Sequence, residues 1–136
     1  MKKLYCLVIA ILLMGTALSK AQTNSVPAEL SLAFKTGNVE KISEYLNSTV
    51  ELIILDKEDF YSKQVAKTIL TEFFKSNPVK EFIIKHQGGG QNNANFAIGS
   101  LRTANGSFRV YFLIKKVGAD QLIHQLRIEK DDSKSN

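Results

Sequence analysis

The chain has 136 residues, a formal net charge of +5 and a single cysteine, Cys6. Because Cys6 lies in an N-terminal segment that we expect to be removed, the mature chain has no thiol for a disulfide, for thiol catalysis or for a thiolate metal site. The lysines are scattered along the chain rather than gathered in a basic stripe, which argues against nucleic-acid binding.

Residues 1–21 have the pattern of a secretory signal peptide. Two lysines precede an apolar run from Leu4 to Met14, and small residues follow this run. Ala21 ends a small-x-small cleavage pattern, so we expect the mature chain to begin at Gln22 and to be exported to the periplasm or the medium. The apolar run is shorter than the roughly 20 residues of a membrane-spanning helix, so we expect no membrane span after cleavage.

The mature chain, residues 22–136, has the length of a single domain, with a core at about 26–129 and a charged tail at 130–136. Removal of the three lysines of the signal peptide leaves 15 basic residues against 13 acidic ones, a net charge of about +2. Much of the basic character of the full sequence therefore belongs to the signal peptide.

Two short helices are expected first. Pro27 suits the first turn of a helix, with Ser25 before it as a candidate cap. Gly37 suits the end of this helix, because glycine readily adopts the left-handed conformation found there. Asn38 can then cap a second helix from Val39 to Leu46.

A strand and the clearest helix of the chain follow. Val50 to Leu55 is rich in β-branched residues, which favour a strand. Ser62 can cap a helix whose apolar residues recur at helical spacing. These residues are Val65, Ala66, Ile69, Leu70, Phe73 and Phe74. Asn77 and Pro78 end the helix, because a residue before proline disfavours helical geometry.

The remainder of the chain is expected to form four strands in a meander, at Val79 to Gln87, Ala94 to Thr103, Ser107 to Lys116 and Gln121 to Glu129. A glycine-rich loop joins the first two strands, and Asn105-Gly106 favours a two-residue turn between the next two. The predicted fold is therefore α+β, with three N-terminal helices packed on one face of a curved, mostly antiparallel sheet of about five strands.

Several short motifs carry a family resemblance over about residues 26–129. They are Leu30-x-x-Ala33-Phe34-x-x-Gly37-Asn38, Tyr61-Ser62-Lys63, Phe73-Phe74, His86-Gln87-Gly88, Ala97-Ile98-Gly99, Asn105-Gly106-x-Phe108-Arg109-Val110-Tyr111 and Ile123-His124-x-Leu126-x-Ile128. With these motifs the chain resembles a family of exported bacterial proteins of unknown function. That family falls within the nuclear transport factor 2-like superfamily, whose cystatin-like cone is shared with ketosteroid isomerase. The superfamily contains enzymes and non-enzymes, so the resemblance implies a fold and not an activity.

One position departs from the isomerase-like members of the superfamily. Those members carry a catalytic aspartate at the end of a strand that resembles Thr49-Val50-Glu51, and the matching residue here is Leu52. A leucine side chain cannot abstract a proton, which argues against isomerase chemistry of that kind. Asp56 or Asp59 could still supply an acid.

No metal, cofactor or catalytic motif is expected from the sequence. His86 and His124 are the only histidines, and no acid stands near either of them at the spacing of metal ligands. The three glycines at 88–90 join two strands instead of leading into a helix N-terminus, so they do not fit a phosphate loop. No G-x-S-x-G motif is present.

Four residues are candidates for a ligand pocket inside the cone, namely His86, His124, Tyr61 and Asp56. His86 shares the period-two pattern of Phe82, and His124 shares that of Leu126, so both histidines are predicted to face the helices if no bulge intervenes. Burial on that face would lower the pKa of each imidazole, because it disfavours the charged form.

The opposite face of the last two strands is a candidate interface. Arg109, Tyr111, Gln125 and Arg127 alternate with apolar residues, so they are predicted to share the face that points away from the helices. Tyrosine and arginine are enriched in protein interfaces, although such a face can also be merely solvated. The resemblance implies a homodimer, because members of the superfamily often pair through their sheets.

The sequence favours an exported, non-enzymatic domain that binds either a small ligand in the cone or an exported protein on the sheet face. The alternative is a small-molecule lyase, isomerase or hydrolase with a His/Tyr/Asp pocket. A deep cavity with a convergent acid, base and tyrosine would favour the enzyme, whereas a filled cone would favour the interaction module.

Overall fold

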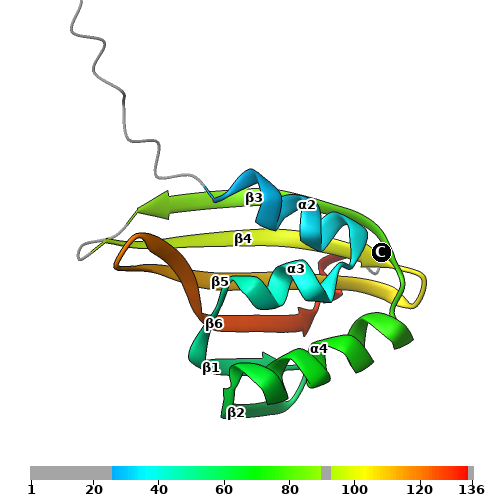
Figure 1. The fold of residues 1–136 in the computed structure, drawn as a ribbon. Helices are drawn as coiled ribbons and strands as arrows, with labels where there is room; N and C mark the ends of the chain where they lie inside the picture. The colour runs from blue at the N-terminus through cyan, green and yellow to red at the C-terminus, as the bar shows by residue number, and fades with distance from the viewer. Residues whose placement is uncertain (1–25, 90–92, 135–136) are drawn as a thin grey trace, which may run out of the picture.

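The computed structural model describes residues 26–89 and 93–134. Residues 1–25, which include the predicted signal peptide and Ser25, the centre of the glycine-rich loop and the last two residues lie outside this range. Three α-helices of the described residues lie on one side of a six-stranded sheet (Figure 1). They are α2 (Ala28–Thr36), α3 (Val39–Glu44) and α4 (Lys63–Ser76), and a short 3-10 helix, η1 (Asp132–Lys134), follows the last strand.

Three of the predicted caps are present, whereas the start of α2 differs from the prediction that Pro27 lies in its first turn. Gly37 follows α2 in the left-handed conformation, with a φ of 63°. Asn38 and Ser62 precede α3 and α4, and each side chain accepts a hydrogen bond from the backbone N–H three residues ahead, at 3.2 and 3.3 Å. Pro27 occupies the N-cap position of α2, which has no side-chain cap there.

The strands are β1 (Leu46–Ile54), β2 (Lys57–Ser62), β3 (Val79–Gly89), β4 (Ala94–Thr103), β5 (Gly106–Val117) and β6 (Asp120–Lys130). Their order in the sheet is β2-β1-β6-β5-β4-β3. Only β1 and β6 are parallel, and every other neighbouring pair is antiparallel. The sheet is therefore mostly antiparallel, as predicted.

Three features differ from the predicted fold. The sheet has six strands instead of about five, because Lys57–Ser62 forms β2 at its edge. Charged residues begin this segment and disfavour a strand, but an edge strand tolerates them because most of its side chains are exposed. In addition, α4 follows the first hairpin, so the three helices do not all precede the sheet. The helix α3 also ends at Glu44, and Leu46 already belongs to β1.

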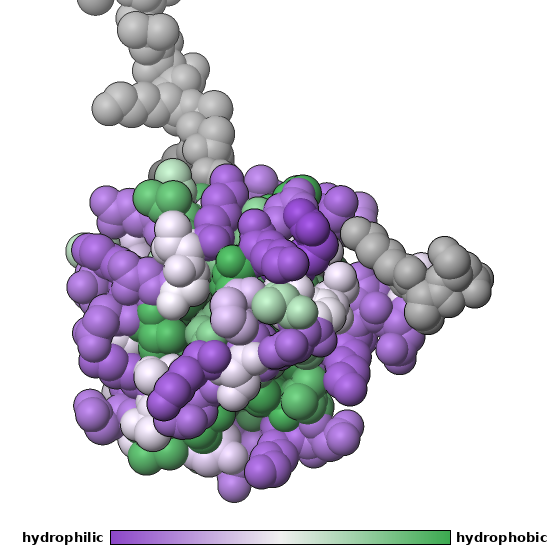
Figure 2. Space-filling model, turned by 90° about the vertical axis from the view of Figure 1, so that its right-hand side faces the viewer, coloured by the Kyte–Doolittle hydropathy of each residue, from purple (hydrophilic) through white to green (hydrophobic). Residues whose placement is uncertain are grey.

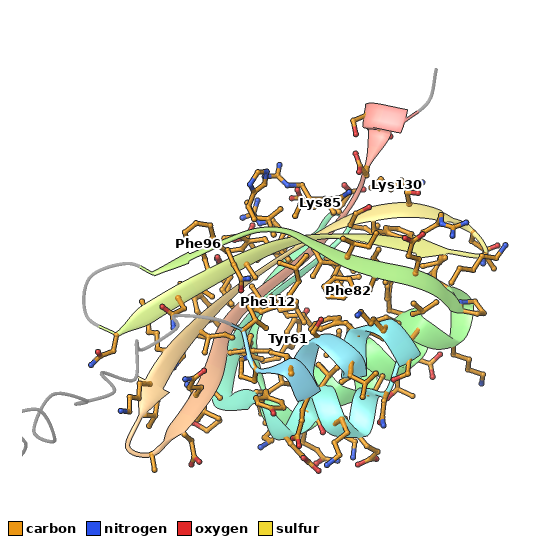
Figure 3. All side chains as sticks on the ribbon, turned by 90° about the horizontal axis from the view of Figure 1, so that it is seen from above. Tyr61, Phe82, Lys85, Phe96, Phe112 and Lys130 are labelled. Carbon is orange, nitrogen blue, oxygen red and sulfur yellow. The ribbon has the colours of Figure 1, made fainter. Side chains whose placement is uncertain are left out.

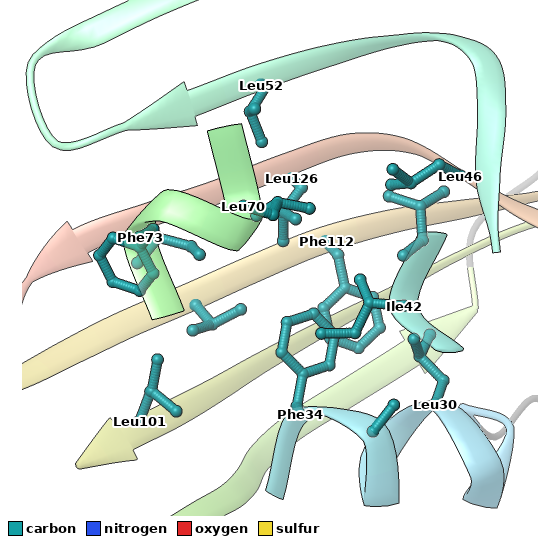
Figure 4. Packing of buried hydrophobic residues seen from close by; sticks show 14 of the residues in the cluster. Leu30, Phe34, Ile42, Leu46, Leu52, Leu70, Phe73, Leu101, Phe112 and Leu126 are labelled. Carbon is teal, nitrogen blue, oxygen red and sulfur yellow. The ribbon is translucent and has the colours of Figure 1, made fainter. Parts of the chain in front are cut away.

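The hydrophobic core fills the space between the helices and the sheet (Figure 4). Phe34 of α2 is fully buried at its centre, and its ring centroid lies 5.1 Å from that of Phe82 in β3 and 5.5 Å from that of Phe112 in β5. Figure 3 shows Phe82 and Phe112 between the sheet and the helices. Burial of each such side chain stabilises the fold by roughly 1.5–3 kcal/mol. Aromatic rings thus occupy the middle of the cone.

Candidate functional site

The structure places His86 on the outer face of the sheet, where its side chain is exposed. The pairing of β3 with β4 shifts register after Ile84, so Lys85 is an extra residue and His86 pairs with Ile98. One extra residue in a strand moves the following side chains to the opposite face. The prediction that His86 faces the helices is therefore wrong.

A second bulge displaces His124. Ile114 of β5 pairs with Ile123 and Leu113 pairs with Gln125, so His124 has no partner residue on β5. Ile123 and the following apolar residues of β6 are fully buried, whereas His124 is only partly buried. His124 is thus the extra residue of this bulge, and the predicted alternation of His124 with Leu126 on one face of β6 is wrong.

The two ring nitrogens of His124 lie in different surroundings. Its Nδ1 lies 3.5 Å from Nδ2 of Asn47, and its buried Nε2 has no hydrogen-bond partner among the described residues. Burial lowers the pKa of His124, and the positive charge of Lys115 lowers it further. This imidazole is therefore held in its neutral form over a wider pH range than a free histidine.

The two histidines do not meet in one pocket. His86 lies on β3 and His124 on β6, and β4 and β5 separate these strands in the sheet. Neighbouring strands lie about 4.8 Å apart, so β3 and β6 are separated by three such spacings. One small ligand therefore cannot contact both histidines. The interior of the cone is filled by the rings of Phe34, Phe82 and Phe112.

Tyr61 and Asp56, the other two pocket candidates, do line the same pocket. It lies between the β1–β2 hairpin and the second half of α4, and its volume is about 650 Å³. The lining residues are Leu52, Ile54, Leu55, Asp56, Lys57, Tyr61, Ile69, Glu72, Phe73, Ser76 and Asn77. Neither histidine is among them, so this pocket offers a phenol and carboxylates without an imidazole. The sequence did not predict Glu72 as a lining residue, because no short sequence pattern shows that α4 lies beside the tip of the β1–β2 hairpin.

All four interface candidates line a single hollow on the outer face of the sheet. Arg109 and Tyr111 of β5 and Gln125 and Arg127 of β6 surround a volume of about 330 Å³, together with Glu129. Tyr111 pairs with Arg127 in the β5–β6 register, which brings the phenol and the guanidinium side by side. The prediction from strand alternation that these four residues share one face of the sheet is therefore confirmed.

Hydrogen bonds and ion pairs position part of this hollow. Gln125 donates from Nε2 to Oε2 of Glu51 at 2.9 Å, and Arg127 donates from NH1 to Oε1 of Glu129 at 3.2 Å. Within the described ranges Arg109 makes no ion pair, and its side chain is exposed. Arg109 is thus a cation of the hollow that forms no ion pair with another described residue, although it pairs with Glu129 in the β5–β6 register.

Comparison with known proteins assigns the family. The family model of DUF4783, a domain of unknown function, matches residues 27–129. The chain belongs to the DUF4783 family.

Crystal structures of other DUF4783 proteins are similar to this chain over almost their whole length. One from Bacteroides uniformis is 40% identical, with a TM-score of 0.74, and the match covers 79% of this chain and 99% of that one. One from Bacteroides ovatus is 38% identical, with a TM-score of 0.75, and the match covers 80% and 98%. No curated protein matches the chain.

More distant structures show the wider fold. A designed NTF2-like protein is 17% identical, with a TM-score of 0.59, and the match covers 74% of this chain and 90% of that one. This DUF4783 domain therefore has an NTF2-like fold.

Two further observations concern the part of the chain that the structure describes. No group of three or more histidine, cysteine, aspartate or glutamate residues lies close enough together there to hold a metal ion. No helix in the same part is long and apolar enough to cross a membrane.

Proposed function

We propose that this protein is an exported, non-enzymatic DUF4783 domain that binds a protein partner through the outer face of its sheet, and that a second copy of the chain is such a partner. The observation that carries the proposal is the contrast between the two faces of the sheet. The phenyl rings of Phe82 and Phe112 on the inner face pack against Phe34 of α2, whereas Arg109, Tyr111 and Arg127 line an open hollow on the outer face.

The filled interior favours binding at a surface. Phe34, Phe82 and Phe112 are each no more than 1% exposed and occupy the middle of the cone. A catalytic pocket needs an acid, a base and a substrate volume that converge, and the two histidines lie apart from Tyr61. An enzyme of the His/Tyr/Asp kind thus lacks its imidazole in the pocket that holds the phenol.

The outer face of the sheet suits a two-fold symmetric dimer because it carries both positively and negatively charged side chains. In a two-fold dimer the same patch lies on both subunits, so the patch must be complementary to itself. Arg109 and Arg127 supply positive charge, and Glu51 and Glu129 supply negative charge, all from the strands β1, β5 and β6. A rotated second copy can place Arg109 against a carboxylate.

Sedimentation velocity of the mature chain, residues 22–136, tests the proposal. We expect the sedimentation coefficient to rise from that of a monomer to that of a dimer as the concentration reaches the micromolar range. A chain that stays monomeric at millimolar concentration would contradict self-association through this face.

A further inference from the structure

The pocket between the β1–β2 hairpin and α4 lies at the end of the molecule where β1 ends and α4 leads into β3. Its interior is apolar, with Leu52 and Ile54 on the β1 side and Ile69 and Phe73 on the α4 side. Figure 2 looks at this end of the molecule and shows hydrophobic surface surrounded by hydrophilic residues. The volume of about 650 Å³ falls within the roughly 300–1,000 Å³ of small-molecule sites.

The lip of this pocket contains a leucine in an unusual backbone conformation. Leu55, at the tip of the hairpin, has a φ of 57° and a side chain that is 40% exposed. Side chains other than glycine rarely adopt this left-handed region, and such residues gather at ligand clamps. Leu55 donates its backbone N–H to the carbonyl oxygen of Ile128 at 2.8 Å, which holds the tip in place. The turn thus keeps an apolar side chain at the entrance where a glycine would fit the backbone better.

The rim of the pocket carries more negative than positive charge. Asp56 lies on the hairpin side and Glu72 on the α4 side, and neither carboxylate forms an ion pair within the described ranges. Lys57 is the single cation of the rim, and Tyr61 adds a phenol without a hydrogen-bond partner among those residues. Two carboxylates on facing walls exceed one ammonium group, so the rim is net negative.

We infer that this pocket binds a small cationic amphiphile. The apolar body of the ligand lies in the apolar interior of the pocket beneath Leu55, and its protonated amine lies between Asp56 and Glu72. A cation is favoured over an anion because it neutralises two carboxylates that are otherwise unpaired. The site is separate from the sheet face proposed above as an interface, so either proposal can fail without the other.

Decylamine and decanoate, both below their aggregation concentrations, are suitable probes because they share an alkyl chain and differ in the charge of the head group. In calorimetric titrations of the mature chain we expect saturable binding of decylamine, about two- to fivefold tighter than that of decanoate. We expect NMR shift changes at Leu55 and Ile69. Absence of saturable decylamine binding, equal affinities, or shift changes confined to β5 and β6 would overturn the inference.

The double variant Asp56→Asn/Glu72→Gln should bring the affinity ratio of the two probes close to one. Glu58→Gln is the matched control, because Glu58 pairs with Ile53 and therefore lies on the other face of the hairpin from Leu52. This control removes one carboxylate from the same strand pair and should leave the ratio unchanged. An equal loss of preference in both variants would show that total charge, and not this site, selects the amine.

Discussion

The ring of Phe82 occupies the space that a side chain on Gly99 would need. A Cβ atom at position 99 would lie 2.6 Å from the nearest ring carbon, closer than real Cβ contacts. Gly99 belongs to β4 and Phe82 to β3, and both face the helices. The absence of a side chain at Gly99 therefore allows Phe82 to reach Phe34 at the centre of the core.

This contact predicts a large effect of a single methyl group. Gly99→Ala should lower the free energy of unfolding by about 1–3 kcal/mol, because overpacking displaces the Phe82 ring. Urea denaturation measures the change, and Ser100→Ala on the opposite face of β4 is the control. The double variant Gly99→Ala/Phe82→Leu should recover part of the loss, and strictly additive effects would contradict the proposed clash.

The lowered pKa of His124 predicts a dependence of stability on pH. The unfolded chain binds a proton at the ordinary histidine pKa of about 6.5, whereas the folded chain binds it only at lower pH. Stability is therefore full above about pH 6.5 and declines as the pH falls toward the folded value, by at most about 1.4 kcal/mol per pH unit. Urea denaturation between pH 7.5 and about 5.5 measures this decline.

Substitution of each histidine separates the contributions to this decline. His124→Gln should flatten it, while His86→Gln, at an exposed position, should leave it in place. A decline of the same steepness in His124→Gln and in the unmodified chain would refute the assignment to His124.

The positive φ of Leu55 predicts an unusual response to glycine. Leu55→Gly should leave the free energy of unfolding unchanged or raise it by up to about 1 kcal/mol, because relief of the left-handed conformation offsets the entropy that glycine adds to the unfolded chain. Val117 is similarly exposed, at 45%, and lies in a strand, so Val117→Gly should be destabilising. Thermal denaturation compares the two variants, and an equal loss would argue against strain at Leu55.

The phenol at the sheet hollow should be a major contact of the proposed dimer. Tyr111→Ala should weaken self-association at least about tenfold, because truncation of a tyrosine that is an interface hot spot costs about 2 kcal/mol or more. Leu32→Ala is the matched control, because Leu32 is 58% exposed on α2, on the opposite side of the sheet. Sedimentation equilibrium gives both dissociation constants. A comparable weakening by the two variants would place the contact elsewhere.

Local chemistry explains which parts of the fold the sequence predicted. Asn38 and Ser62 cap helices by accepting hydrogen bonds from N–H groups three residues away. A short stretch of sequence is therefore enough to predict their roles. Strand alternation placed Arg109 and Tyr111 on one face, because β5 keeps its alternation through those positions. The motifs that carry the family resemblance extended these local signals to about residues 26–129.

The failures have a common origin in contacts between strands. The extra residues at Lys85 and His124 are defined only by the register of a partner strand, and each reverses or displaces the side chains that follow. Strand β2 was missed because its stability depends on pairing with β1 and not on its own composition. The presence of Asp56 and Glu72 at one pocket likewise depends on how α4 lies against the hairpin.

Hydroxyl-radical footprinting across a concentration series measures the central claim most directly, because it reports the exposure of individual rings. The half-buried Tyr111 should be modified more slowly as the mature chain passes from monomer to dimer. Tyr45, which follows α3 on the helix side and donates a hydrogen bond to Glu29 at 3.4 Å, should keep a constant rate. Constant modification of Tyr111 while the chain dimerises would contradict a partner-binding role for the outer face of the sheet.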